Sequence, residues 1–339
     1  MGSRLREAAL RRTTLEPIDL TFYGVNLFLA GVNLVVAAGA ESTSRHVPAA
    51  LGFVAACAVP GLLSLAWERL PARLKERLPG RAVRFLRVFY VHAFYGTYFA
   101  EVILLSQAVW GGASLDAPIA WVEEAIFGFQ PALEFSERFA HLKPVNELLF
   151  LGYFSYYPIL TTGFWVMYAT GRHEAARRAV FIATTSFAVL YVWYVFVPVH
   201  GPKYFFAVLN ERWYSEFEGY LAVPLMRMIF GNMNLAGAAL PSSHVAIGLI
   251  ALILLRPHVR GLYRVYLGLF VVLCVSTVYI YAHYAVDIVA GLAVVPLLLR
   301  FARSLYPPVR RLTTRTASSA PDGADGGRPG DPPERLTRP

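Results

Sequence analysis

The chain has 339 residues, of which 56% are apolar and 16% charged, and its formal net charge is +9. A mean hydropathy of +0.48 is well above what a soluble globular domain needs, so the composition predicts a polytopic membrane protein. The two cysteines, Cys57 and Cys274, lie in apolar runs and offer neither a disulfide framework nor a zinc-binding pattern.

Eight apolar runs are candidates for membrane-spanning helices, each of which needs about 20 residues. In chain order they are 20–40, 47–67, 88–110, 148–169, 179–199, 241–255, 262–282 and 284–301. An unbroken helix over 262–301 would be about 60 Å long, about twice the hydrocarbon thickness, so a turn is expected near His283 and Asp287. We therefore expect an all-α, polytopic membrane helical bundle of about eight transmembrane helices.

Basic residues cluster before the first run and in alternate connections, at 68–87, 171–178 and 256–264. This asymmetry places those connections and both termini in the cytoplasm, in a multi-pass protein of the cell (plasma) membrane. The connections 111–147 and 200–240 then face outward. Because the positive charge lies beside membrane spans, it favours contact with anionic lipid headgroups over binding of nucleic acid.

Polar residues stand at the start of the sixth apolar run, in "ALPSSHVAIGL" (239–249). Pro241 suits the first position of a helix, where the amide that proline lacks would have no partner. The following free amides and the helix dipole make an anion site. Ser242 and Ser243 add hydroxyl donors, and His244 can give or take a proton.

Two further segments reach the same, outer face. His283 and Asp287 are four residues apart and are expected on one face of the eighth helix. There Asp287 can accept from one ring nitrogen of His283 and leave the other as a nucleophile. The segment "VPVHGPKYF" (197–205) bends at its prolines and glycine, so Lys203 can turn back toward the histidines.

Each residue also has a simpler explanation. A single histidine at a membrane edge often serves packing or the interface, and Lys203 alone suits an anchor that extends to the headgroups. Asp287 is harder to explain in this way, because carboxylates inside a membrane are costly and usually functional. The joint arrangement favours a site.

The segments "PSSH" (241–244) and "HYAVD" (283–287), separated by 38 residues, resemble motifs of the type-2 phosphatidic acid phosphatase superfamily. Its second motif is Pro-Ser-Gly-His, and its third is Ser-Arg-x5-His-x3-Asp. The resemblance covers about 195–295. It implies that His283 is the nucleophile, that Asp287 orients it and that His244 is the general acid. It also implies that Ser242 and Ser243 bind phosphate.

Two departures from the family pattern concern its cationic residues. Thr277 stands at the arginine position of the third motif, and the first motif, Lys-x6-Arg-Pro, is absent. Phosphate needs cationic partners, so we expect Lys203 first, and then Arg212 or Arg227, to replace them. The segments "GPKYF", "STVYIYAHYAVD" and "ELLFLGYFSYYPI" are similar to the inositol phosphorylceramide synthase branch of the superfamily.

The resemblance also suggests a division of the chain. Residues 1–19 form a basic cytoplasmic N-terminus, and 20–170 form the first membrane helices, with 111–147 as an outer interfacial loop. Residues 171–302 form the phosphatase- or phosphotransferase-like core. Residues 303–339 end in a Pro/Gly/Asp-rich sequence and are expected to be a disordered cytoplasmic tail.

The reaction that the resemblance implies is metal-independent transfer of phosphate from a membrane lipid through a phosphohistidine, without a cofactor. Water as acceptor makes a phosphatase, and an alcohol makes a headgroup transferase. Two alternatives remain from the residues alone. His244, His283 and Asp287 could bind a metal that activates water, or Asp287 and Glu101 could relay protons in a transporter. The sequence indicates no oligomeric state.

Overall fold

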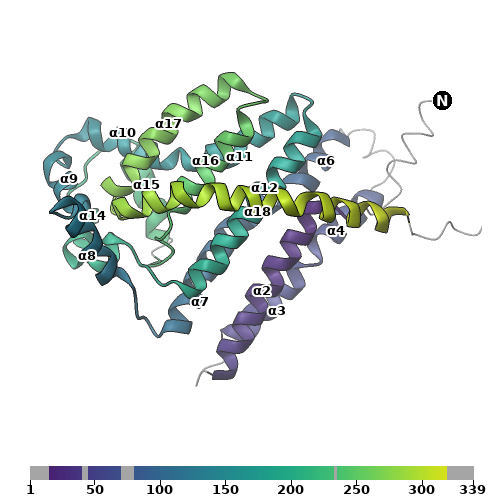
Figure 1. Ribbon diagram of the computed structural model, residues 1–339, viewed down its shortest axis with the longest axis horizontal. Helices are drawn as coiled ribbons and strands as arrows, with labels where there is room; N and C mark the ends of the chain where they lie inside the picture. Colours follow the sequence, from purple (N-terminus) through teal and green to yellow (C-terminus); the bar gives the residue numbers. More distant parts are fainter. Residues whose placement is uncertain (1–14, 40–44, 70–79, 233–234, 319–339) are drawn as a thin grey trace, which may run out of the picture.

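The computed structural model describes residues 15–39, 45–69, 80–232 and 235–318, and within these ranges it consists of helices without strands (Figure 1). The first helices are α2 (Pro17–Gly39), α3 (His46–Ala56), α4 (Val59–Arg69), α6 (Gly80–Phe89), the short 3₁₀ helix η1 (Tyr90–Phe94) and α7 (Tyr95–Trp110). Next come α8 (Asp116–Phe127), α9 (Pro131–Phe139), α10 (Lys143–Phe154) and α11 (Tyr156–Ala169). The chain continues through α12 (His173–Phe196), α13 (Pro202–Phe205), α14 (Ala207–Ser215), α15 (Ala222–Asn232), α16 (Ser243–Leu255), α17 (Arg260–Tyr279) and α18 (Ala285–Ser318).

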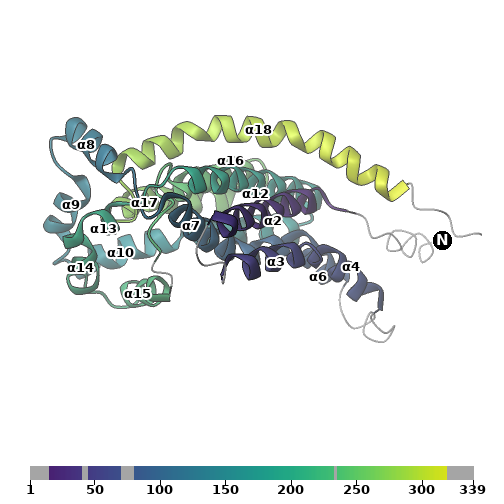
Figure 2. The same cartoon turned by 90° about the horizontal axis from the view of Figure 1, so that it is seen from below.

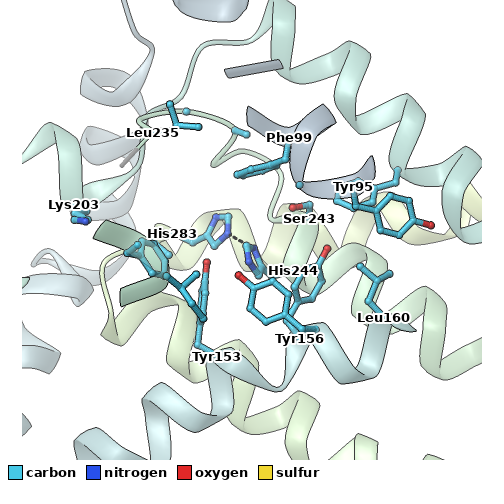
Figure 3. A pocket seen from close by; sticks show the side chains of 18 of the residues that line it. Tyr95, Phe99, Tyr153, Tyr156, Leu160, Lys203, Leu235, Ser243, His244 and His283 are labelled. Carbon is cyan, nitrogen blue, oxygen red and sulfur yellow. Dashed lines mark hydrogen bonds between the residues drawn. The ribbon is translucent and has the colours of Figure 1, made fainter. Parts of the chain in front are cut away.

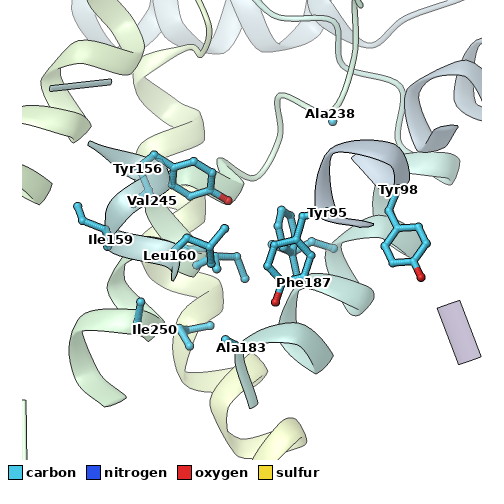
Figure 4. Close-up of a cluster of buried hydrophobic side chains, with 14 of the residues drawn as sticks. Tyr95, Tyr98, Tyr156, Ile159, Leu160, Ala183, Phe187, Ala238, Val245 and Ile250 are labelled. Atoms are coloured by element: carbon cyan, nitrogen blue, oxygen red, sulfur yellow. The ribbon is translucent and has the colours of Figure 1, made fainter. Parts of the chain in front are cut away.

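The helices form an elongated bundle. In both views α8, α9 and α14 gather at one end, while α4, α6 and the C-terminal half of α18 lie toward the other (Figures 1 and 2). The central helix is α12, which packs against α2, α7, α11, α16 and α18. In its most apolar segment 72% of the residues are buried, against 33% in α17 and in α18. Side chains from α11, α12 and α16, such as Ile159, Phe187 and Val245, fill the core between these helices (Figure 4).

The bundle confirms the all-α, multi-pass membrane architecture, but not the number of spans. Among the described residues, five helices are long and apolar enough to cross a membrane, and the bent pair α3–α4 makes a sixth if it counts as one span. The two other predicted spans have different structures. The run 241–255 is the short helix α16, which at 13 residues is only about 20 Å long.

The predicted span 148–169 is divided between α10 and α11. The two helices meet at Ser155, whose hydroxyl donates to the carbonyl of Gly152 at 2.6 Å. Pro158 lies in the first turn of α11 and has no amide to donate to the carbonyl of Phe154, so a regular helix cannot continue through this point. Hydropathy does not detect such a break, because both halves are apolar.

The last helix is longer than expected. The predicted turn within 262–301 is confirmed between α17 and α18, but α18 continues to Ser318, so 303–318 are helical where disorder was expected. Contacts with the start of α12 explain the extension: the hydroxyl of Tyr306 donates to Glu174 at 2.9 Å, and Arg310 forms an ion pair with the same carboxylate at 3.2 Å. The remainder of the predicted tail, 319–339, lies outside the described residues.

Buried polar contacts join the N-terminal helices to α7. Asn33 of α2 donates to Glu101 of α7 at 2.9 Å, and Arg45 forms an ion pair with the other carboxylate oxygen of Glu101 at 2.7 Å. Asn26, one α-helical heptad earlier, donates to the hydroxyl of Tyr98 at 2.7 Å. Both oxygens of Glu101 are therefore engaged in packing α2 and the start of α3 against α7.

Candidate active site

Two histidines from different helices meet inside the bundle. His244 lies in the first turn of α16, and His283 lies in the turn between α17 and α18. Nδ1 of His244 is 3.1 Å from Nε2 of His283, and both side chains are buried (Figure 3). The expectation that His283 lies on the last helix is wrong, because α18 begins only at Ala285. The turn is still tight enough to bring His283 and Asp287 together.

The second nitrogen of His283 fixes the state of its ring. Nδ1 is 2.8 Å from the carbonyl oxygen of Ala239 and 3.5 Å from Oδ2 of Asp287. A carbonyl can only accept, so Nδ1 carries the proton and Nε2 has a lone pair. In this tautomer, Nδ1–H of His244 donates to Nε2 of His283. This hydrogen bond occupies the lone pair of Nε2, so a group that bonds to Nε2 must take the place of His244 as its partner.

Asp287 shapes the turn in addition to facing His283. Its Oδ2 accepts from the backbone N–H of Tyr284 at 2.9 Å, and its own carbonyl accepts from the N–H of Ser242 at 3.1 Å. Asp287 therefore joins the histidine turn, through its carboxylate, to the start of α16, through its backbone carbonyl. The carboxylate of Asp287 lies near His283, as predicted, with Oδ2 3.5 Å from Nδ1. The carbonyl oxygen of Ala239, at 2.8 Å, is the nearer acceptor for Nδ1–H.

The two serines have different roles in the structure. Ser242 is the N-cap of α16, and its hydroxyl accepts from the N–H of Val245 at 3.4 Å. Ser243 follows it and lines the cavity described below. The prediction that both hydroxyls face phosphate is therefore not supported for Ser242, whose side chain satisfies the helix instead.

Lys203 is the cation that the structure brings to the histidines. Its side chain is 1% exposed, and Nζ has no hydrogen-bond or ion-pair partner among the described residues. Aromatic rings surround it, with centroids 4.3 Å (Trp213), 5.0 Å (Tyr214) and 5.3 Å (Phe230) from Nζ. Such rings stabilise a cation without neutralising it. Burial lowers the pKa of Lys203 to about 8.

The two predicted arginines lie elsewhere. Arg212 forms ion pairs with Glu137 at 2.7 Å and Glu216 at 3.1 Å. Arg227 donates to the carbonyl of Phe217. Neither arginine lines the cavity. Because Arg212 already has carboxylate partners, its charge is not free for phosphate.

Lys203, Ser243, His244 and His283 line one cavity of about 270 Å³. Its other walls are mostly aromatic or aliphatic, and come from α7, α11, α12 and the segment before α16. Tyr153, near the end of α10, and Tyr156, at the start of α11, pack against His244, with ring centroids 4.7 and 4.4 Å from that of His244 (Figure 3). The cavity thus has a polar, cationic end and a long apolar wall.

One residue that the sequence analysis did not single out joins two parts of this site. Asp116, at the start of α8, is fully buried and accepts from the backbone N–H groups of His200 and Gly201, at 2.8 Å each. It also accepts from the hydroxyl of Tyr284 at 3.0 Å. One carboxylate therefore holds the segment before Lys203 against the turn that carries His283.

Glu123 lies about two helical turns after Asp116 on α8 and contacts the same turn. One of its carboxylate oxygens accepts from the N–H of Ala285 at the start of α18, and the other has no partner in the part of the chain that the structure describes. Burial raises the pKa of the Glu123 carboxyl to about 7. The predicted outer loop 111–147 is thus a helical element that supports the site.

Comparison with known families agrees with the histidine geometry. A model of the PAP2 superfamily matches residues 119–301, which is more than half of the chain. The chain belongs to the PAP2 superfamily, the type-2 phosphatidic acid phosphatases. Comparisons with curated proteins and with solved structures give no match. Membership supports a phosphatase-type enzyme in a multi-pass membrane protein. The matched region begins before the predicted core, 171–302, and includes α9, α10 and α11.

In this PAP2 protein Thr277 occupies the position of the third-motif arginine, and its contacts lie within the histidine turn. Its hydroxyl donates to the carbonyl of Cys274 at 2.8 Å, and its own carbonyl accepts from the N–H groups of Ala282 and His283, each at 3.0 Å. Thr277 does not line the cavity. It shapes the histidine turn, whereas Lys203, on another segment, lines the cavity.

Gly201 permits the close approach of the Lys203 segment to the histidine turn in this PAP2 site. Its φ is +93°, and a Cβ would lie 2.9 Å from the carbonyl oxygen of Ala282. We expect Gly201→Ala to lower the free energy of unfolding by about 1–3 kcal/mol and to reduce activity. Gly268→Ala, on an open helix surface, is the matched control. Equal stability of the two variants in thermal unfolding would contradict this tight fit.

Proposed function

We propose that this protein is a metal-independent lipid phosphatase or phosphotransferase that works through a phosphohistidine at His283. The observation that carries the proposal is a buried lysine ammonium, with no counter-ion among the residues that the structure describes, in the same cavity as a hydrogen-bonded histidine pair. A buried unpaired cation is costly unless an anion binds there. A phosphate group is such an anion, and the adjacent histidines supply the nucleophile and the proton.

The proposed reaction has two steps. In the first, Nε2 of His283 attacks phosphorus, the bond from phosphorus to the leaving oxygen breaks, and His244 gives that oxygen a proton. In the second, His244 takes a proton from water or an alcohol, which attacks phosphorus and releases His283. The ammonium of Lys203 and the amides at the start of α16 stabilise the negative charge of the phosphoryl oxygens.

The surroundings of the site favour a lipid substrate. The cavity lies within a bundle of apolar helices, and aromatic and aliphatic side chains form most of its wall. A phosphate ester with apolar chains can bury them there, whereas a small water-soluble ester leaves most of the wall uncovered. We also propose that the protein lies in the plasma membrane with both termini in the cytoplasm and the site outward, which the positions of its basic residues support.

Purified protein in excess EDTA, supplied with labelled lipid phosphates and phospholipids, tests this function. We expect turnover in EDTA, which the metal alternative does not allow. Release of inorganic phosphate would identify water as the acceptor, and formation of a new phospholipid would identify an alcohol, as in the inositol phosphorylceramide synthase type. Absence of turnover on every lipid, with a folded protein, contradicts the proposal.

The pH dependence of kcat/KM should report the charge of Lys203. The ammonium form binds phosphate, and its fraction decreases as the pH rises through about 8, the pKa of Lys203 in the free protein. We therefore expect kcat/KM to decrease about tenfold per pH unit above that value. Lys203→Arg keeps its charge at these pH values, so the alkaline decrease should move upward or vanish. An unchanged alkaline limb in this variant would exclude Lys203 as its cause.

A further inference from the structure

The cavity continues away from the histidine pair to a second polar position at His92. In Figure 3, Lys203 lies at one end of the labelled side chains and Tyr95 at the other. The ring of His92 lies beside Tyr95, with centroids 5.2 Å apart, and it lines the same cavity. The site for the phosphate and the position of His92 are thus separate parts of one space.

The ring of His92 has one defined tautomer. The indole Nε1–H of Trp165 donates to its Nδ1 at 3.2 Å. Because an indole nitrogen can only donate, Nδ1 of the neutral ring carries no proton and Nε2 does. Nε2 is buried and has no hydrogen-bond partner among the residues that the structure describes. His92, which lines the cavity, is therefore left with an unpaired hydrogen-bond donor, Nε2–H, and no free acceptor.

A second unsatisfied donor belongs to another residue that lines the cavity, Tyr156. The hydroxyl of Tyr156 is buried and has no partner in the described ranges, and its ring packs against His244. By contrast, the hydroxyl of Tyr95 is paired with Thr184 at 2.6 Å. Buried polar groups are usually hydrogen-bonded, so those that remain unpaired in a cavity mark the positions of ligand atoms.

The cavity opens sideways from this position. Its lining includes Gly96 and Tyr157, which are exposed, on α7 and α11 respectively. Both helices pack against α12, and Phe187 of α12 contributes to the wall between them. The opening thus lies on an apolar side of the bundle, where chains of a lipid can leave the cavity.

From this geometry we propose that His92 is a specificity-determining residue that binds a carbonyl oxygen of the lipid, so that the substrate is an acylated lipid phosphate rather than an isoprenoid one. The inference rests on the proposed function for the phosphate end. An ester or amide carbonyl lies between the phosphate and the chains of an acylated lipid and accepts from Nε2–H of His92, with Tyr156 as a further donor. A polyprenyl phosphate has no acceptor there and leaves both donors unpaired.

The test compares a diacyl phosphatidate with its dialkyl ether analogue, which has the same phosphate and chains but no carbonyl oxygens. We expect the protein to prefer the ester by about tenfold or more in kcat/KM, since the ether leaves a buried donor without a partner. His92→Phe keeps a ring but has no donor, so the preference should disappear. His92→Gln can still donate and should retain part of it, whereas His141→Phe, an exposed position, should retain all of it.

Hydrolysis of 4-nitrophenyl phosphate, which has neither chain nor carbonyl, shows whether the His92 variants remain folded. Binding of both lipids is measured in parallel as a shift in Tm. Inactivity on both lipids counts against the proposed function. In that case the ratio of the affinities for ester and ether still tests whether His92 binds a carbonyl oxygen. Equal use or binding of ester and ether by the unmodified protein, an ester preference that survives in His92→Phe, or a preference for polyprenyl phosphate overturns it.

Discussion

Replacing His283 by alanine should abolish turnover of lipid phosphates, with a decrease in kcat of at least about 10⁴-fold. The reason is that Nε2 of His283 is the atom proposed to form the bond to phosphorus, and Nε2 carries a lone pair because the ring proton is on Nδ1, beside Ala239 and Asp287. Steady-state assays with a labelled lipid phosphate measure the loss. His141→Ala, an exposed histidine, is the matched control and should keep full activity.

Trapping of the labelled intermediate separates the nucleophile from a purely structural residue. A phosphohistidine is labile in acid and stable in alkali, so label should remain on the unmodified protein after an alkaline quench and be lost in acid. His283→Ala should carry no label. If that variant keeps full turnover, or carries the same acid-labile label, the assignment of the nucleophile is wrong.

Loss of His244 should depend on the leaving group. A general acid contributes about 10²–10⁴-fold where the departing oxygen needs a proton. The alkoxide of a lipid needs one, whereas 4-nitrophenolate leaves as a stable anion. We therefore expect His244→Ala to lose about 10²–10⁴-fold in kcat/KM with a lipid phosphate and about tenfold or less with 4-nitrophenyl phosphate. We compare kcat/KM because it reports the first step and not the second, in which His244 acts as a base for both substrates.

The comparison of the two substrates controls for misfolding, because a general defect lowers both rates alike. His283→Ala should lose both activities, since both substrates need the nucleophile. Equal losses on the two substrates in His244→Ala would contradict its role as general acid and leave it only its 3.1 Å contact with His283. The ratio of the two losses therefore distinguishes an acid from a positioning residue.

The sequence was sufficient to find the parts of the site that lie in short motifs. His244 and His283 were recognised because their segments reach the same face and resemble two motifs of one family, and Lys203 because the prolines and glycine near it bend the chain. Arg212 was misjudged: its partner Glu137 is determined by packing, while Glu216 is only four residues along the chain. From composition alone, every basic residue in an outer connection is equally suited to phosphate.

Contacts between distant segments could not be predicted. Asp116 is separated by 168 residues from Tyr284, with which it shares a hydrogen bond, and nothing in the local sequence distinguishes it from the other acids of 111–147. The significance of His92 depends on its contact with Trp165, 73 residues later. The helical bundle itself followed from hydropathy, while the break at Ser155 and the extension of α18 depended on local hydrogen bonds and on Glu174.

The aromatic surroundings of Lys203 have a consequence for the rate at which the protein works. Rings around an ammonium keep it charged without supplying a competing anion, so on the proposed function the cationic end of the cavity is also a position for free inorganic phosphate. We therefore expect added inorganic phosphate to compete with the lipid substrate and to slow turnover.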